Sequence, residues 1–164
     1  MIARLGRVHL RVATLGRAIS FYTKVLGLSV SRRERGVAFL AAGDGRHELA
    51  LHVHDPQAPR PPLWLGCCFV GFEVTSKSAL VQVCARLGGA RATIVATGDS
   101  WSVHTTDPDG NGVEIYWLTP EPLRTEADHT VRTLSLAELE AAAETEVMTP
   151  RPAAVCEWYD ADHT

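Results

Sequence analysis

Asp107-Pro-Asp-Gly-Asn-Gly-Val-Glu-Ile-Tyr-Trp117 is the most informative segment of the sequence, because a tight turn leads directly into an alternating strand. Its proline fixes φ and its two glycines can adopt positive φ, so the first half predicts a reversal of the chain. From Val113 onward apolar and polar residues alternate, which places Glu114 and Tyr116 on one face of a strand. If that face is buried, the carboxylate of Glu114 needs a partner, since an unpaired buried charge is too costly to keep.

Length, composition and charge limit what the rest of the chain can be. The 164 residues are 46% hydrophobic and carry a net charge of -3, which suits one core or two small similar modules sharing one. No basic run of the kind that binds phosphates is present, so we expect no nucleic-acid partner. No apolar stretch can span a bilayer and no signal-peptide core opens the chain, so we expect no membrane partner and a cytoplasmic protein. The four cysteines lack paired metal spacing and are expected to be reduced thiols.

The first third of the chain predicts one strand, one helix and three more strands. Residues 7–12 alternate as a strand. Apolar residues between Leu15 and Leu26 then recur at helical spacing, with Thr14 as a candidate N-cap and Gly27 as the C-terminal stop. Three short strands are expected at residues 29–33, 37–41 and 48–53.

The same order recurs after a linker. Residues 55–62 contain four prolines and cannot pair inside a sheet. Residues 69–74 match residues 7–12 position for position, Ser76 can cap a second helix, and strands are expected at residues 93–96, 101–105 and 113–117. With one gap, Glu114 falls opposite Glu48. This duplication, at a period of about sixty residues, predicts an α+β fold of two βαβββ modules that form a shared cup-shaped cavity.

We therefore divide the chain into four parts. The first module covers residues 1–54, the proline-rich linker 55–65, the second module 66–118 and a C-terminal extension with one helix 119–164. In the extension Ser135 is the expected cap, with Glu138 reaching back to it and Leu134 packing on Leu139.

The combined motifs resemble the vicinal oxygen chelate superfamily. The resemblance rests on Leu10-x-Val12, on Phe21-Tyr22 followed by residues 25–28 (Val-Leu-Gly-Leu), and on the Asp107 to Trp117 stretch, and it covers about residues 4–118. Within that group the chain most resembles small catechol-2,3-dioxygenase-like and glyoxalase/bleomycin-resistance-like proteins. The resemblance implies a cavity between paired modules, a small-molecule ligand and a homodimer.

The same resemblance implies where a metal would bind, and this chain departs from the pattern. Family members commonly hold one divalent ion through His from each module's first strand and Glu from the last. Glu114 matches the carboxylate and Glu48 falls at a further ligand position, but Arg7 and Phe69 stand where the histidines would be. Arginine stays protonated and phenylalanine has no lone pair, so we expect no metal cofactor. One hypothesis places the Arg7 guanidinium between the two carboxylates; the alternative directs Arg7 to the cavity mouth and Glu48 to solvent.

Three strand histidines are candidates for proton transfer. His9 shares a face with Arg7, His52 shares one with Glu48, and His104 precedes the turn. Imidazole titrates near neutral pH, so each can act as an acid or base, although a hydrogen-bonded wall residue is the plainer interpretation. A relocated Fe or Zn site that combines these histidines with Glu114 is a further alternative.

Aromatic residues are expected to line the ligand pocket. Phe69, Trp101 and Tyr116 favour a flat, apolar or aromatic ligand, and core packing explains Trp101 equally well.

These residues leave two classes of function open. The first is an enzyme on a small oxygenated, aromatic or polyketide-like molecule, working without a metal by enolisation, dehydration, cyclisation or epimerisation. Its expected catalytic residues are Glu114, His9 and Arg7, and its expected substrate-binding residues are Glu48, His52, Phe69, Trp101, His104 and Tyr116. The second is a drug-binding, resistance-type protein that changes nothing in its ligand. A metal-dependent dioxygenase or glyoxalase-like enzyme ranks third.

Overall fold

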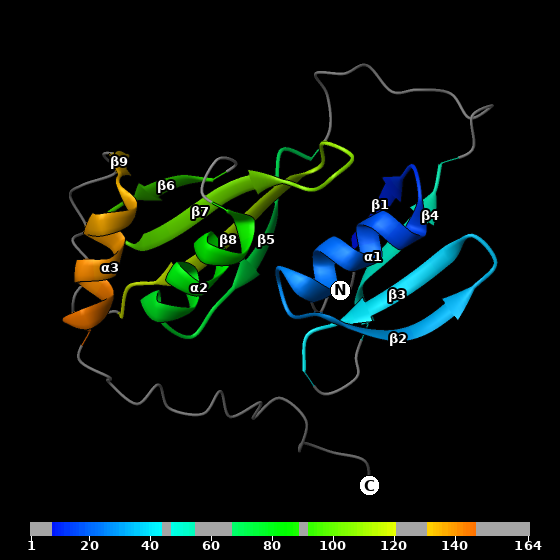
Figure 1. Ribbon diagram of the computed structural model, residues 1–164, viewed down its shortest axis with the longest axis horizontal. Coiled ribbons are helices and arrows are strands. Elements are labelled where there is room, and N and C mark those ends of the chain that lie inside the picture. Colours follow the sequence, from blue (N-terminus) through cyan, green and yellow to red (C-terminus); the bar gives the residue numbers. More distant parts are fainter. Residues whose placement is uncertain (1–7, 44–46, 55–66, 89–91, 121–130, 147–164) are drawn as a thin grey trace, which may run out of the picture.

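A computed structural model of the chain describes residues 8–43, 47–54, 67–88, 92–120 and 131–146, without the side chains of residues 47 and 48. The predicted linker and the position of Arg7 lie outside these residues. Two sheets, each with a helix packed on it, make up the structure (Figure 1). The α+β class and the order βαβββ are confirmed, and the order occurs twice.

The first module is a four-stranded sheet with one helix. Its elements are β1 (Val8–Val12), α1 (Leu15–Lys24), β2 (Ser29–Glu34), β3 (Val37–Ala41) and β4 (His47–Val53). The strands lie in the order β1-β4-β3-β2, and only β1 and β4 run parallel. A parallel neighbour cannot be reached through a hairpin, so the chain passes through the helix and two other strands before β4 returns beside β1.

The second module repeats this arrangement and adds a strand. Its elements are β5 (Val70–Glu73), α2 (Lys77–Leu87), β6 (Thr93–Ala96), β7 (Ser100–Thr106) and β8 (Gly112–Leu118). The order is β5-β8-β7-β6-β9, with β5 and β8 parallel. β9 (Arg132–Leu134) belongs to the C-terminal extension.

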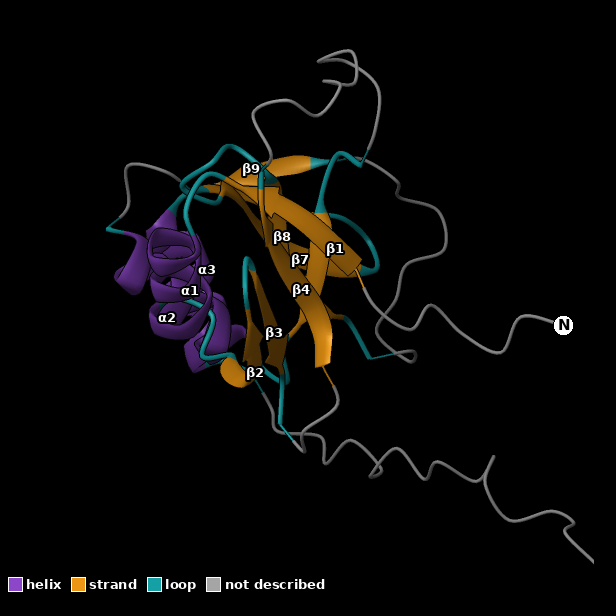
Figure 2. Cartoon of the chain, turned by 90° about the vertical axis from the view of Figure 1, so that its right-hand side faces the viewer, coloured by secondary structure: helices purple, strands orange, loops and turns teal. Residues whose placement is uncertain are grey.

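All three helices lie on the same side of the strands (Figure 2). The strand residues that face the helices are apolar and buried, among them Leu10, Leu51, Val103 and Ile115. The residues between them in sequence lie on the face that no described helix covers. On that face Ala50 and Ser102 are buried, His104 is partly exposed and His9 is exposed. Strand alternation thus separates a packing face from a face free for chemistry.

The helix starts follow the sequence signals to different degrees. Ser76 caps α2, where its side chain accepts a hydrogen bond from the backbone N–H of Ala79 at 3.2 Å. Thr14 occupies the N-cap position of α1, but its side chain makes no capping bond. None of the described helices is both long and apolar enough to cross a membrane.

The C-terminal extension contains a strand as well as the expected helix, which corrects the prediction of a helix alone. β9 pairs antiparallel with β6, and α3 (Leu136–Glu144) packs against α2. The capping box of Ser135 and Glu138 is present as predicted. Glu146, just beyond α3, accepts a hydrogen bond from the backbone N–H of Lys77 at 2.8 Å, so the extension also caps the first turn of α2.

Candidate functional site

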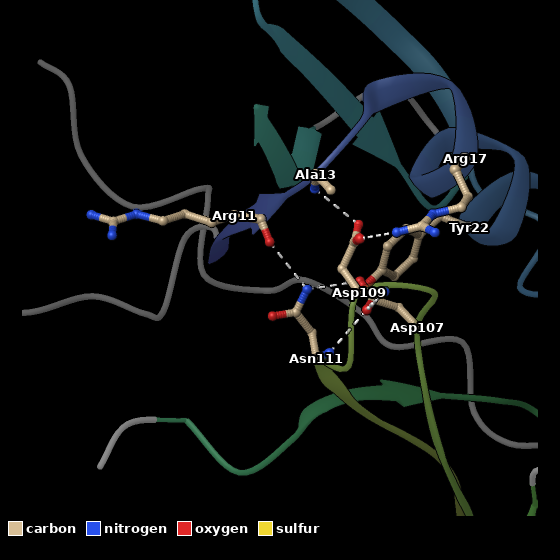
Figure 3. Close-up of polar contacts among 7 residues, drawn as sticks. All are labelled: Arg11, Ala13, Arg17, Tyr22, Asp107, Asp109 and Asn111. Carbon is tan, nitrogen blue, oxygen red and sulfur yellow. Dashed lines mark hydrogen bonds and ion pairs between the residues drawn. The ribbon is translucent and has the colours of Figure 1, made fainter. Parts of the chain in front are cut away.

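The turn between β7 and β8 is organised by one buried carboxylate, Asp107, which is only 2% exposed (Figure 3). One of its oxygens accepts the backbone N–H groups of Asp109 and Asn111, both at 2.9 Å. Its other oxygen accepts hydrogen bonds from the Asn111 side-chain amide at 2.8 Å and from the Tyr22 hydroxyl at 3.1 Å. Burial, with the charge of Asp107, raises the pKa of Tyr22 far above its ordinary value. Tyr22 therefore stays a hydrogen-bond donor to Asp107.

The same turn fastens the second module to the first. Asp109 accepts a hydrogen bond from the backbone N–H of Ala13 at 3.1 Å and forms an ion pair with Arg17. The Asn111 amide donates to the carbonyl oxygen of Arg11 at 3.3 Å. The turn therefore holds the corner between β1 and α1 against the two strands, β7 and β8, that carry the site.

The two glycines of the turn are required for different structural reasons. Gly110 has a positive φ of 87°, as expected for the reversal. Gly112 does not, which corrects that part of the prediction: a Cβ there would overlap the backbone carbonyl of Cys68. Gly112 is needed because the segment that leads into β5 passes too close for any side chain.

Directly beyond the turn, His104 on β7 and Glu114 on β8 form a hydrogen-bonded pair. The two residues are register partners, and His104 Nε2 lies 3.2 Å from Glu114 Oε1. The Phe69 ring lies against the imidazole with a centroid distance of 4.7 Å. The His104 and Glu114 side chains are 30% and 33% exposed and Phe69 is 44% exposed. The condition that would bury Glu114 is therefore not met; its carboxylate is about one-third exposed and has a histidine partner.

Tyr116 extends this group along β8, and a glycine makes room for it. A Cβ on Gly71, the residue opposite Glu114 on β5, would lie 3.2 Å from a ring carbon of Tyr116 and 3.5 Å from Glu114 Oε2. The side chains of β8 therefore rest directly on the β5 backbone.

In the first module, His9 on β1 and His52 on β4 form a second pair. His9 Nδ1 lies 2.7 Å from His52 Nε2, and the ring centroids are 4.9 Å apart. Both residues lie on the face away from the helices. The structure thus groups the predicted histidines into two pairs, one in each module.

Trp101 does not belong to this face, which corrects the prediction that it lines the pocket with Phe69 and Tyr116. It pairs in register with Trp117 on the side of β7 that faces the helices, and Lys77 Nζ lies 4.6 Å from the centroid of each of the two rings. Its neighbours are therefore core residues and α2. Core packing is the interpretation that holds.

The register also corrects the match between Glu48 and Glu114. Leu49 lies opposite Val8 in the first module as Val113 lies opposite Val70 in the second, so Ala50 is the counterpart of Glu114. His104 pairs with Glu114, and Phe39 in β3 pairs with Ala50, so Phe39 is the counterpart of His104. Glu48 is two residues away on the same strand face, and its side chain, like Arg7, lies outside the described residues.

These positions do not fit the metal that the resemblance implies. Phe69 has no donor atom, and Glu114 is the one metal-binding side chain described at the expected positions, because Arg7 and the Glu48 side chain lie outside the described residues. Within the described ranges, no three His, Cys, Asp or Glu side chains gather as ligands of one ion. We derive no step through a metal.

Several known proteins are similar to this chain in sequence or in fold. Residues 4–115 match the family model of the Glyoxalase/Bleomycin resistance protein/Dioxygenase superfamily. Virulence protein STM3117 of Salmonella typhimurium is 28% identical over an alignment of 127 positions, which covers 70% of this chain and 84% of that protein. Two solved structures share the fold. A glyoxylase/bleomycin resistance protein/dioxygenase domain from Frankia sp. EAN1pec has a TM-score of 0.58 at 21% identity (73% of this chain, 100% of that one). Lactoylglutathione lyase from Agrobacterium tumefaciens has 0.52 at 23% (71% and 94%).

Proposed function

Since the chain belongs to the Glyoxalase/Bleomycin resistance protein/Dioxygenase superfamily, we propose that it is an enzyme that acts on a small oxygenated, aromatic or polyketide-like molecule by acid–base chemistry. The observation that carries the proposal is the pair of His104 and Glu114, half-exposed beside the Phe69 ring. Enolisation, dehydration, cyclisation and epimerisation all require one group that removes a proton and returns it. A histidine held by a carboxylate is suited to that step at neutral pH.

The roles within the pair follow from its geometry. Glu114 accepts a hydrogen bond from one ring nitrogen of His104, Nε2, which fixes the orientation of the imidazole. Nδ1 is then the nitrogen left to face a substrate. Phe69 offers an apolar surface beside the imidazole, which suits a flat ring or a polyketide-like chain.

Stability alone does not explain this pair. Both side chains are about one-third exposed, and ion pairs at that exposure contribute little to folding because water screens them. The proposal moves His104 from substrate binding to catalysis and keeps Glu114 in the catalytic set. It assigns no role to Arg7 or Glu48.

We also propose that the reaction needs no metal cofactor. Arg7 and Phe69 stand at two of the positions where the resemblance places metal ligands, and neither offers a lone pair, which supports chemistry carried by side chains alone.

The test is turnover by matched variants. We expect His104→Asn and Glu114→Gln to lower the turnover number about a hundredfold or more, because each removes part of a proton-transfer group. His54→Asn, which removes an imidazole outside the pair, should turn over as wild type does. A panel of aromatic and polyketide-like metabolites, followed by product mass with and without a chelator, supplies the measurement. Full turnover by both pair variants contradicts the proposal, and loss of turnover with chelator alone favours a relocated metal site.

A binding protein without chemistry is the second candidate. The large exposed aromatic Phe69 favours it, since such a ring can hold a flat ligand without any acid or base. In that case ligands bind wild type and Glu114→Gln with similar affinity, and no ligand changes mass. The same incubations therefore distinguish the two functions.

A further inference from the structure

The first module has its own polar group on the uncovered face, separate from His104 and Glu114. His9 and Arg11 alternate along β1 on that face, and Arg11 is the register partner of His52 on β4. His9 and Arg11 are exposed and His52 is partly buried. The three side chains therefore come from two adjacent strands and are open to solvent.

The two imidazoles form a hydrogen bond along the line between their rings. The centroids are 4.9 Å apart and the facing nitrogens 2.7 Å apart, so the difference leaves room only for the two ring radii. His9 Nδ1 and His52 Nε2 therefore point at one another. This is the geometry of an N–H···N hydrogen bond, in which one ring donates and the other accepts.

This geometry always leaves a donor directed outward. If His9 donates from Nδ1, then His52, which accepts at Nε2, carries its own proton on Nδ1. If His52 donates from Nε2, then His9 carries its proton on Nε2. In either arrangement the neutral pair presents one N–H group for a further acceptor.

A metal ion fits the pair poorly. Zinc binds imidazole nitrogen at about 2.0–2.1 Å, so an ion between two nitrogens that face each other needs them about 4 Å apart. The observed separation of 2.7 Å has no room for it. A positively charged Arg11 on the neighbouring strand position adds an unfavourable charge for any cation.

Arg11 instead favours an anion. Its carbonyl oxygen is held by Asn111, while its side chain extends away from the turn network (Figure 3). Within the described ranges its guanidinium forms no ion pair or hydrogen bond. Guanidinium and imidazole N–H groups together are donors matched to a carboxylate or phosphate oxygen.

We propose that His9, His52 and Arg11 form an oxyanion-binding subsite that holds an acidic group of the small molecule on which the protein acts. The identification of the anion with the substrate rests on the proposed function; the binding of an anion does not. The second module then supplies the proton-transfer pair, and the first module supplies the group that recognises a carboxylate or phosphate.

The test uses benzoate and inorganic phosphate as two probes of the same chemistry. We expect benzoate or phosphate to shift the ring signals of His9 and His52 in nuclear magnetic resonance titrations of the full chain, and not those of His54. Arg11→Gln and His52→Gln should weaken the binding of the effective probe about tenfold or more, because each removes a donor to a charged oxygen. Arg33→Gln on β2 and His54→Gln are the matched controls and should bind as wild type does.

Each outcome either supports or overturns the anion-binding subsite. A response to benzoate alone identifies a carboxylate site, and a response to phosphate alone identifies a phosphate site. No saturable response to either probe, equal weakening by the control variants, or a response of the pair to Zn²⁺ alone overturns the subsite. Since His104→Asn leaves the three donors in place, its anion binding should be unchanged. If anion binding fails while the His104 and Glu114 variants still lose turnover, the subsite is wrong and the proposed function stands.

Discussion

Asp107 has two backbone N–H groups, one amide and one phenol directed at its two oxygens, and it is nearly sealed from water. At the scale of single residues this is the buried carboxylate of the deciding turn. The sequence indicates Glu114 instead, because alternation identifies a strand face without saying which face is covered. The partner of Glu114 is equally absent from the local pattern, since His104 reaches it only through the pairing of β7 with β8.

Tyr22→Phe tests the contact between Tyr22 and Asp107. We expect the variant to lose about 1.5–3 kcal/mol of unfolding free energy, because it removes a buried hydrogen bond to a charged group. The pKa of Tyr22 is raised in the folded protein, mainly by burial and then by the charge of Asp107. Its stabilising contribution is therefore complete below about pH 10, the unfolded value, and falls as pH rises beyond that.

Urea unfolding at pH 8 and near pH 10.5 gives the measurement. Tyr22→Phe should lose less stability than wild type between the two values, whereas Tyr116→Phe, the control on the uncovered face, should keep the wild-type loss. An unchanged alkaline loss in Tyr22→Phe would show that Tyr22 is not the titrating group.

At the scale of strands and helices, the sequence predicts well which elements form and in what order. It predicts less well which residues of neighbouring strands pair. Helix caps and turn residues are local signals, so the two modules and the capping box of α3 can be predicted. Register is different: a slip of one residue moves a strand's apolar side chains to the wrong face, but a shift of two leaves every face unchanged. Apolar pattern therefore cannot distinguish Glu48 from Ala50 as the counterpart of Glu114. β9 has only three residues, too few for a pattern.

Trp101 is the case where a usable signal was present. Trp101 lies two residues before Val103, an apolar residue, and therefore shares a strand face with it. His104 shares the other face with Ser102. The strand's own period thus places the tryptophan on the packing face and the histidine on the other.

Glu138→Gln tests the capping box of α3. Hydrogen bonds from the backbone N–H and then the hydroxyl of Ser135, with a smaller effect of Arg132, lower the pKa of the Glu138 carboxyl. A lowered folded pKa means that the contribution is present above the unfolded value of about 4.3 and is lost as pH falls through the folded value. Glutamine keeps the acceptor oxygen but does not titrate.

Amide hydrogen exchange in α3 at pH 7 and at pH 3 checks this. After correction for intrinsic exchange, we expect Glu138→Gln to lose less protection at acid pH than wild type, with Glu140→Gln as the control on the same helix. Equal acid losses in wild type and Glu138→Gln would remove the titrating cap as the cause.

At the scale of the whole molecule, two modules of similar fold carry different side chains on the uncovered face and are joined by the turn at Asp107 to Asn111. The helices share one side (Figure 2). The other side carries the hydrogen-bonded pair of His104 and Glu114 in one module and two imidazoles with an arginine in the other. Contacts from the Asp107 to Asn111 turn to β1 and α1, and from Arg86 to the Val25 carbonyl oxygen at 3.1 Å, connect the modules. The turn thus sets where one group lies relative to the other.

Asp109→Ala tests this connection, because Asp109 holds both the Ala13 backbone and Arg17. We expect it to cost about 0.5–1.5 kcal/mol of unfolding free energy, since it removes a hydrogen bond whose donor, the exposed Ala13 N–H, can bond to water instead. Arg17→Gln should cost under about 1 kcal/mol, because the arginine side chain is 55% exposed and its ion pair is screened. Hydrogen exchange should locate the effect: amides at the end of β1 and the start of α1 lose protection in Asp109→Ala, while those of α3 keep it. Arg33→Gln is the control for charge removal. If the Ala13 amide exchanges at the wild-type rate in Asp109→Ala, Asp109 does not hold the modules together, and within the turn their relative placement depends on the buried contact between Tyr22 and Asp107 instead.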